Sequence, residues 1–169
     1  MQERCKIGVV IGNANSPHAV NIMKGIDQAS KECDVQIRYF MNVSSPYTAQ
    51  LYPPDTSIGW DYQKSAIYDY ARYVKADVLI MTYGMMSIFM KSDYGKQYLE
   101  YFRNVPCVLI NEQTDRPNWT SIIVDNYNGM YELVEHLVRD HGYHNFAFLA
   151  GPSGNTDACQ RKRAFLDVM

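Results

Sequence analysis

The stretch Ser121-Ile-Ile-Val-Asp-Asn-Tyr-Asn-Gly-Met130, with the residues that follow it, decides the fold of this chain. The apolar run at 121–124 is typical of a strand. Asp125 or Asn126 can accept backbone N–H bonds at a helix start. Apolar residues then recur at helical spacing, and Gly142 stands where the residue after a helix adopts a positive φ. The stretch therefore predicts a strand followed by a capped amphipathic helix.

The same alternation of strands and helices extends over the rest of the chain. Downstream, a strand at 145–150 and a Gly/Pro turn precede a final helix at 157–168. Upstream, Ser16-Pro17 has the pattern of a helix start, with Ser as the cap and Pro at the first helical position. Strands separated by helices predict βαβ units and a parallel sheet. The remaining predicted strands are 6–11, 35–41, 77–81 and 106–110, and the remaining predicted helices lie near 60–74 and 94–103.

Composition narrows the classes of protein before any motif is used. The 169 residues are 47% hydrophobic and 20% charged, with a formal net charge of -2, which gives no electrostatic reason to expect a nucleic-acid or anionic-membrane surface. No apolar run approaches the ~18 residues of a membrane span, and no signal-peptide pattern opens the chain. The four cysteines lack CxxC spacing, which suits reduced thiols. These features predict a soluble cytoplasmic domain.

The loops that follow the predicted strands supply the candidate ligand residues. In parallel sheets, ligands bind beyond the carboxyl ends of the strands. Convergent polar groups there could hold a small polar molecule, although Asn and Ser are also ordinary turn and cap residues and tyrosine also fills packing positions. The candidates from these loops are Asn13, Asn15, Ser16, Tyr83, Asn111 and Asp125.

The order of these pieces resembles the ligand-sensing core of the lactose-repressor (LacI) family, which has the type I periplasmic-binding-protein fold. The resemblance rests on Lys6-Ile-Gly-Val9, on Val105-Pro-Cys-Val-Leu-Ile110, and on Gly151-Pro152 followed by Arg161. It implies an α/β fold with a parallel sheet in three layers. Residues 1–124 would form the N-terminal lobe, and residues 125–169 would begin an incomplete C-terminal lobe.

The resemblance also implies a site and partners. A small polar ligand, for example a sugar, would bind between the two lobes, with Arg161 reaching into the cleft and Asp125 close by. The family leads us to expect a homodimer. From the composition and the missing headpiece we expect neither membrane contact nor direct nucleic-acid contact from this chain, and we expect no cofactor. A second interpretation of Arg161, as a solvated helix arginine like its neighbour Lys162, stays open.

Three departures from the family shape the functional expectation. The chain begins at the first strand without a helix-turn-helix headpiece, and it stops soon after the second lobe begins, so we expect a truncated core. Asp140-His-Gly142, the turn at 151–157 and the long insert at 42–62, whose role the sequence leaves open, look most like the sensor domains fused to diguanylate cyclase (GGDEF) or histidine kinase modules.

The leading expectation is therefore a sensor domain that signals to an attached output module. The alternative is the effector-binding core of a LacI-type transcriptional repressor that lacks its DNA-binding headpiece. A third possibility, an exported sugar-binding protein of a transporter, is disfavoured by the absent signal peptide and the free cysteines. The choice depends on whether a headpiece lies upstream or a catalytic module lies downstream.

Neither a metal site nor catalysis is expected from the sequence. His136 and His141 are five residues apart, which places side chains on different faces of a helix, and no cysteine lies near them or near His144. The chain contains no GxSxG or HExxH pattern. We expect no enzyme activity in this chain, and any catalysis would belong to a fused module.

Overall fold

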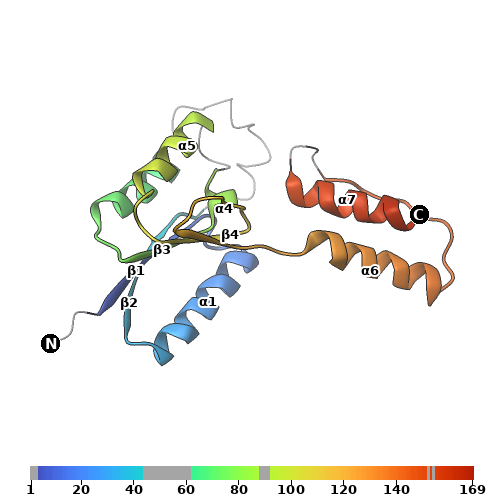
Figure 1. Cartoon of the computed structure of the whole chain (residues 1–169), viewed down its shortest axis with the longest axis horizontal. Helices are drawn as coiled ribbons and strands as arrows, with labels where there is room; N and C mark the ends of the chain where they lie inside the picture. The colour runs from blue at the N-terminus through green and yellow to red at the C-terminus, as the bar shows by residue number, and fades with distance from the viewer. Residues whose placement is uncertain (1–3, 44–61, 88–91, 152, 154) are drawn as a thin grey trace. The chain divides into compact units, whose positions relative to one another are not determined.

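The computed structural model describes residues 4–43, 62–87, 92–151, 153 and 155–169 (Figure 1). The chain divides into two compact units, Met1–Ile123 and Val124–Met169, which are described separately. Most of the long insert, residues 44–61, lies outside the described residues. In the described part of the chain, no helix is both long and apolar enough to cross a membrane.

Unit 1, residues 1–123, is built on a five-stranded sheet in which every neighbouring pair of strands is parallel. The strand order is β2-β1-β3-β4-β5, so β1 lies inside the sheet and the chain crosses over it to reach β3. This confirms the predicted parallel α/β fold. The strands are β1 (Cys5–Ile11), β2 (Val35–Met41), β3 (Val78–Met81), β4 (Cys107–Ile110) and β5 (Trp119–Ile122).

Helices cover both faces of this sheet, which gives the three layers expected from the resemblance (Figure 1). One face packs against α1 through an apolar cluster that includes Val9, Ile11 and Ala19. A larger cluster on the other face includes Val10, Leu79 and residues of the remaining helices. The described helical segments of unit 1 are α1 (Pro17–Glu32), α3 (Tyr62–Tyr70), the 3-10 turn η1 (Ala71–Tyr73), the unpredicted short α4 (Tyr83–Ser87) and α5 (Ser92–Tyr101).

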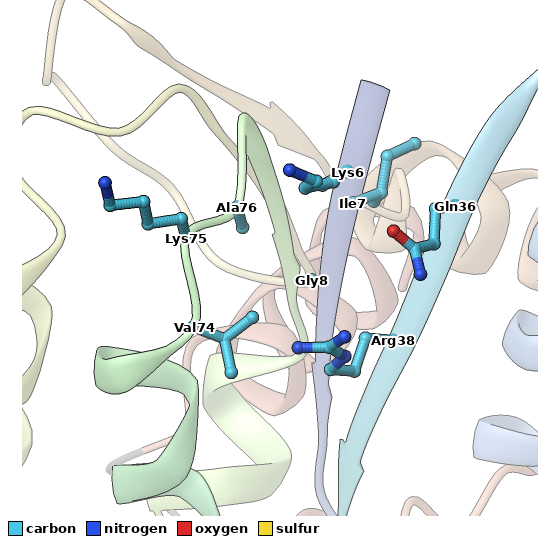
Figure 2. A pocket seen from close by; sticks show the side chains of 8 residues that line it. All are labelled: Lys6, Ile7, Gly8, Gln36, Arg38, Val74, Lys75 and Ala76. Carbon is cyan, nitrogen blue, oxygen red and sulfur yellow. The ribbon is translucent and has the colours of Figure 1, made fainter. Parts of the chain in front are cut away.

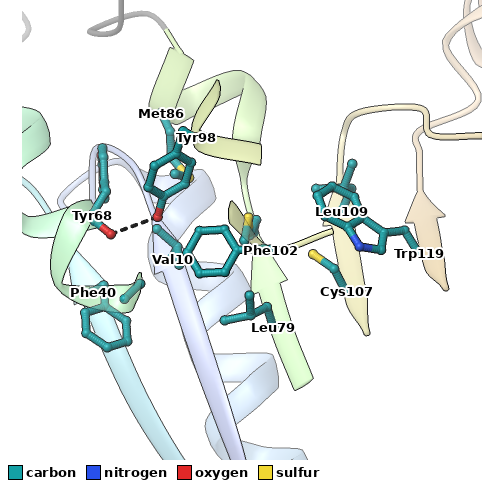
Figure 3. Packing of buried hydrophobic residues seen from close by; sticks show 12 residues of the cluster. Val10, Phe40, Tyr68, Leu79, Met86, Tyr98, Phe102, Cys107, Leu109 and Trp119 are labelled. Carbon is teal, nitrogen blue, oxygen red and sulfur yellow. Dashed lines mark hydrogen bonds between the residues drawn. The ribbon is translucent and has the colours of Figure 1, made fainter. Parts of the chain in front are cut away.

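Two tyrosines link the helices inside the larger cluster (Figure 3). The Tyr98 hydroxyl donates a 2.9 Å hydrogen bond to the backbone oxygen of Tyr68, which joins α5 to α3. The Tyr98 ring also meets Phe102 edge to face, with centroids 5.1 Å apart. The Tyr68 hydroxyl is buried without a hydrogen-bond partner, and burial raises its pKa. Of these two buried tyrosines, Tyr98 therefore has a hydrogen bond for its hydroxyl and Tyr68 does not.

Unit 2, residues 124–169, is a pair of helices packed on each other, α6 (Asn126–Arg139) and α7 (Thr156–Val168). Each begins with a side-chain cap. Asp125 accepts a hydrogen bond from the backbone N–H of Asn128, and Asn155 accepts one from that of Ala158. Gly142, after α6, has the predicted positive φ of 64°.

The prediction of a strand at 145–150 is wrong: these residues do not belong to any sheet. A strand needs a hydrogen-bonding neighbour, and among the described residues of unit 2 there is no other strand. Phe146 and Phe148 rest instead on the ring of Phe165, with centroids 6.3 and 4.7 Å away. Leu149, on the alternate face, is 97% exposed. The segment keeps the alternating apolar pattern of a strand but lacks a strand to pair with.

The two phenols should respond oppositely to removal of the hydroxyl. Tyr98→Phe removes the hydrogen bond to Tyr68 and should lower the free energy of unfolding by about 1 kcal/mol. Tyr68→Phe removes a buried hydroxyl without a partner and should leave that free energy unchanged or raise it by up to about 1 kcal/mol. Urea denaturation of both variants would measure the difference. A larger loss for Tyr68→Phe would contradict the assignment.

Thiol labelling should distinguish the one buried cysteine from the three exposed cysteines. Cys5, Cys33 and Cys159 are exposed, whereas Cys107 is buried in β4, and this burial raises the pKa of its thiol to about 12. Because the thiolate is the reactive form, Cys107 should resist iodoacetamide at neutral pH until the chain unfolds. Peptide mass spectrometry before and after denaturation checks this. Modification of Cys107 in the folded protein would show that β4 opens.

Candidate ligand site

The loop between β1 and α1 is held in place by two buried polar residues. The Thr82 hydroxyl accepts a 3.1 Å hydrogen bond from the backbone N–H of Gly12. The Asn42 side chain accepts from the N–H of Asn13, and its backbone oxygen accepts from that of Ala14, each at 2.8 Å. Thr82 is 2% exposed and Asn42 is 7% exposed. Neither is among the site residues predicted from the sequence, although each directly follows a predicted strand.

Two of the predicted residues have an uncommon backbone conformation. Asn13, after β1, has a φ of 49°, and Asn111, after β4, has a φ of 59°. In the described part of the chain these are the only residues other than glycine with a positive φ. Asparagine tolerates this conformation better than most residues, but it still costs free energy, and such strain concentrates at functional sites. Both residues lie at the carboxyl edge of the sheet.

His18 joins this edge, and sequence reasoning did not find it. Its Nε2 lies 3.0 Å from Nδ2 of Asn111, which connects the first turn of α1 to the end of β4. Because the amide nitrogen can only donate, Nε2 acts as the acceptor and the proton of the neutral ring is on Nδ1. The sequence feature that could have identified His18 is its position two residues after the predicted candidate Ser16.

The other candidates of unit 1 differ in their surroundings. Ser16 caps α1, with its hydroxyl accepting a 3.2 Å hydrogen bond from the N–H of Ala19. Asn15 is exposed beside it. Tyr83 is half-buried against the larger cluster, with its hydroxyl next to Gly95. Burial first, and then the charge of Glu112, raise the pKa of Tyr83. Tyr83 therefore takes part in packing α4.

In unit 2, the side chain of Arg161, from α7, reaches the first residue of α6, next to Asp125. Arg161 donates through Nη1 to Oδ1 of Asn126, whose Nδ2 donates to the backbone oxygen of Val124 at 3.2 Å. Asn126 is 8% exposed, and it too was missed as a positioning residue. Asp125 accepts from the backbone N–H and the side chain of Asn128, and these bonds lower its pKa. Arg161 is thus held by a neutral amide.

A small cavity lies at the opposite edge of the unit 1 sheet, near the amino ends of β1 and β2 (Figure 2). Lys6, Arg38 and Lys75 are among the residues that line it, so its rim is basic. Its volume of about 20 Å³ has room for one water molecule and is too small for a sugar. This cavity is therefore not a candidate for the sugar site.

No protein-family profile matches this chain, but known proteins that resemble it include transcription regulators. The probable HTH-type transcriptional repressor ExuR of Bacillus subtilis (strain 168) is 26% identical over 111 residues, which cover 60% of this chain and 33% of that protein.

Solved structures match over nearly the whole chain. The lac repressor dimer bound to operator and the anti-inducer ONPF is 18% identical with a TM-score of 0.67, over 99% of this chain and 51% of that one. A LacI-family sugar-binding transcriptional regulator of Escherichia coli complexed with phosphate is 14% identical with a TM-score of 0.60, over 96% and 52%. The chain therefore has the LacI-type, periplasmic-binding-protein-like fold. It spans about half the length of these structures.

Two glycines should respond oppositely to an added methyl group. At Gly12 a Cβ would lie 2.6 Å from the backbone oxygen of Met85, so Gly12→Ala must push α4 from the loop and should cost about 1–3 kcal/mol. At Gly25, in the middle of α1, a Cβ meets nothing within 4 Å. Gly25→Ala should therefore stabilise the chain by about 0.5–1 kcal/mol. Thermal unfolding of both variants checks the pair, and a stable Gly12→Ala protein would contradict the close packing.

Proposed function

We propose that this chain is part of the effector-binding core of a LacI-type transcriptional repressor and that it binds a small polar molecule such as a sugar. The fold and the similarity to ExuR support this class. The observation that carries the ligand role is the pair of asparagines with positive φ at one edge of the sheet, where the Asn111 side chain also contacts His18. The repressor alternative replaces the sensor domain as the leading hypothesis, because ExuR and the matching LacI-type structures are transcription regulators.

The chemistry of the unit 1 edge suits a neutral ligand with several hydroxyl groups. Asn13 and Asn111 each carry an amide that both donates and accepts, and the His18 imidazole adds a further polar group. The buried clamp of Thr82 and Asn42 fixes the loop before ligand arrives, so less entropy is lost on binding.

The second half of the site rests on the resemblance. We assign to Arg161 and Asp125 the ligand contacts of the second lobe, with the ligand held between the lobes. A guanidinium held by the neutral amide of Asn126, and not by a carboxylate, can still donate to hydroxyl or carboxylate oxygens of a ligand. Ligand binding changes the output only to the extent that it favours one arrangement of the lobes over the other.

The same proposal includes the partners of the protein and its location in the cell. The protein would be a cytoplasmic homodimer without enzymatic activity, with DNA contact made by a separate headpiece of the HTH type that the name of ExuR denotes. The lac repressor in the matching structure is a dimer. In unit 1, Tyr70, Tyr73 and Tyr101 are 62%, 79% and 55% exposed, and exposed tyrosines of this kind are frequent in subunit interfaces.

Asparagine-to-glycine variants separate ligand contact from backbone strain. Asn13→Gly and Asn111→Gly keep the positive φ at no steric cost but remove the amide. In the full-length gene product that carries this chain, a panel of sugars, sugar acids and sugar phosphates would be tested by thermal shift and then calorimetry. A ligand found for the wild type should bind each variant at least tenfold more weakly, while the melting temperature without ligand is kept.

Gln36→Ala, an exposed change near the amino end of β2, serves as the matched control and should leave binding unchanged. Equal binding by wild type and both glycine variants would place the ligand elsewhere. The repressor role is tested separately by a gel shift with the DNA upstream of the gene. Ligand should change DNA affinity, and a protein that binds ligand but not DNA would return the sensor hypothesis to first place.

A further inference from the structure

The end of α6 brings two histidine rings together. The helix ends at Arg139, and the N–H of Asp140 still donates to the backbone oxygen of His136 at 2.9 Å. His141 follows the helix end by two residues, and its ring lies against that of His136 with centroids 4.7 Å apart. The expectation that these side chains lie on different helix faces is wrong, because His141 is no longer in the helix.

The nitrogen atoms of the two rings face one another. Nε2 of His136 and Nε2 of His141 are 3.0 Å apart. Nδ1 of His136 is 2.5 Å from Oδ2 of Asp140, so Nδ1 carries the proton and Nε2 of the neutral ring carries a lone pair. A carboxylate on the far nitrogen of a histidine is the usual support of a metal-binding imidazole.

We propose that His136 and His141 bind one divalent copper ion through their two Nε2 atoms. With metal–nitrogen bonds of about 2.0 Å, the observed 3.0 Å separation corresponds to an angle of about 95° at the metal. That angle fits two neighbouring positions of a square-planar or tetragonal Cu²⁺ or Ni²⁺ site, whereas tetrahedral Zn²⁺ needs the nitrogens about 3.4 Å apart. Cu²⁺ also has the higher intrinsic affinity for imidazole.

The site is accessible and its proton balance is simple. The side chains of His136 and Asp140 are 52% and 66% exposed, so an ion can enter from solvent. On binding, the proton of His141 moves from Nε2 to Nδ1 by way of water, and no net proton is released from two neutral rings. In the described part of the chain, no three His, Cys, Asp and Glu residues are grouped for metal binding, so water supplies the remaining ligands.

The neighbouring charges do not oppose a cation. Glu135 and Arg139 are paired with each other at 2.9 Å, which offsets the arginine charge one turn from His136. Asp140 adds a negative charge on the far side of the His136 ring. The ring of His141 stacks on Tyr143, with centroids 5.6 Å apart and planes 10° from parallel, which holds its orientation.

The test is a Cu²⁺ titration of the untagged protein, followed by calorimetry and by electron paramagnetic resonance. Cys5, Cys33 and Cys159 are first blocked with iodoacetamide, because exposed thiols bind and reduce Cu²⁺. We then expect one ion per chain and an axial spectrum with coupling to two imidazole nitrogens. His136→Ala and His141→Ala should each weaken binding at least tenfold, and Asp140→Asn should weaken it about tenfold. His144→Ala, an exposed change in the same segment, is the matched control and should bind as the wild type does.

Far-UV circular dichroism shows whether each variant keeps its helices, and the conservative changes His136→Gln and His141→Gln provide a second pair if an alanine variant unfolds. Wild-type affinity in the His136 and His141 variants would overturn the proposal. So would a spectrum without imidazole coupling, a loss of binding in His144→Ala equal to that in the other two, or no binding by the wild type.

Discussion

The pairing of β1 with parallel strands on both of its edges is the constraint on which unit 1 depends. Residues 7–10 of β1 lie in register with β2 on one side and with β3 on the other. Val9, Val10 and Ile11 are consequently at most 1% exposed, and their side chains alternate between the two apolar clusters. Because every strand runs the same way, all the loops that leave carboxyl ends open on a single edge of the sheet.

That shared edge accounts for the polar architecture around it. Burying Thr82 and Asn42 would be costly if their side chains were unpaired, but each accepts a hydrogen bond from a backbone N–H of the β1–α1 loop. The apolar sheet thus sets where the loops leave, and two buried polar side chains set the conformation of the first loop. Asn13 takes its positive φ between them.

Much of unit 1 could be predicted because its signals are local. Apolar runs located the strands to within about two residues, and Ser16-Pro17 located the start of α1. What could not be predicted depends on partners distant in sequence. His18 becomes a candidate only through Asn111, 93 residues away. Residues 145–150 do not form a strand, because no strand among the described residues pairs with them. The histidine pair was missed for another reason, since a spacing rule for helices was applied beyond the helix end.

The unpaired segment at 145–150 also bears on how this chain behaves in solution. It combines alternating Phe146 and Phe148 with the exposed Leu149, and among the described residues no strand pairs with it. Such a segment is a template on which another copy can add a strand. Concentrated samples of this chain alone would then associate through backbone pairing, and that association would be distinct from any dimer made by folded surfaces. A charged residue at position 149 would protect the solubility of the isolated chain without disturbing the aromatic contacts with Phe165.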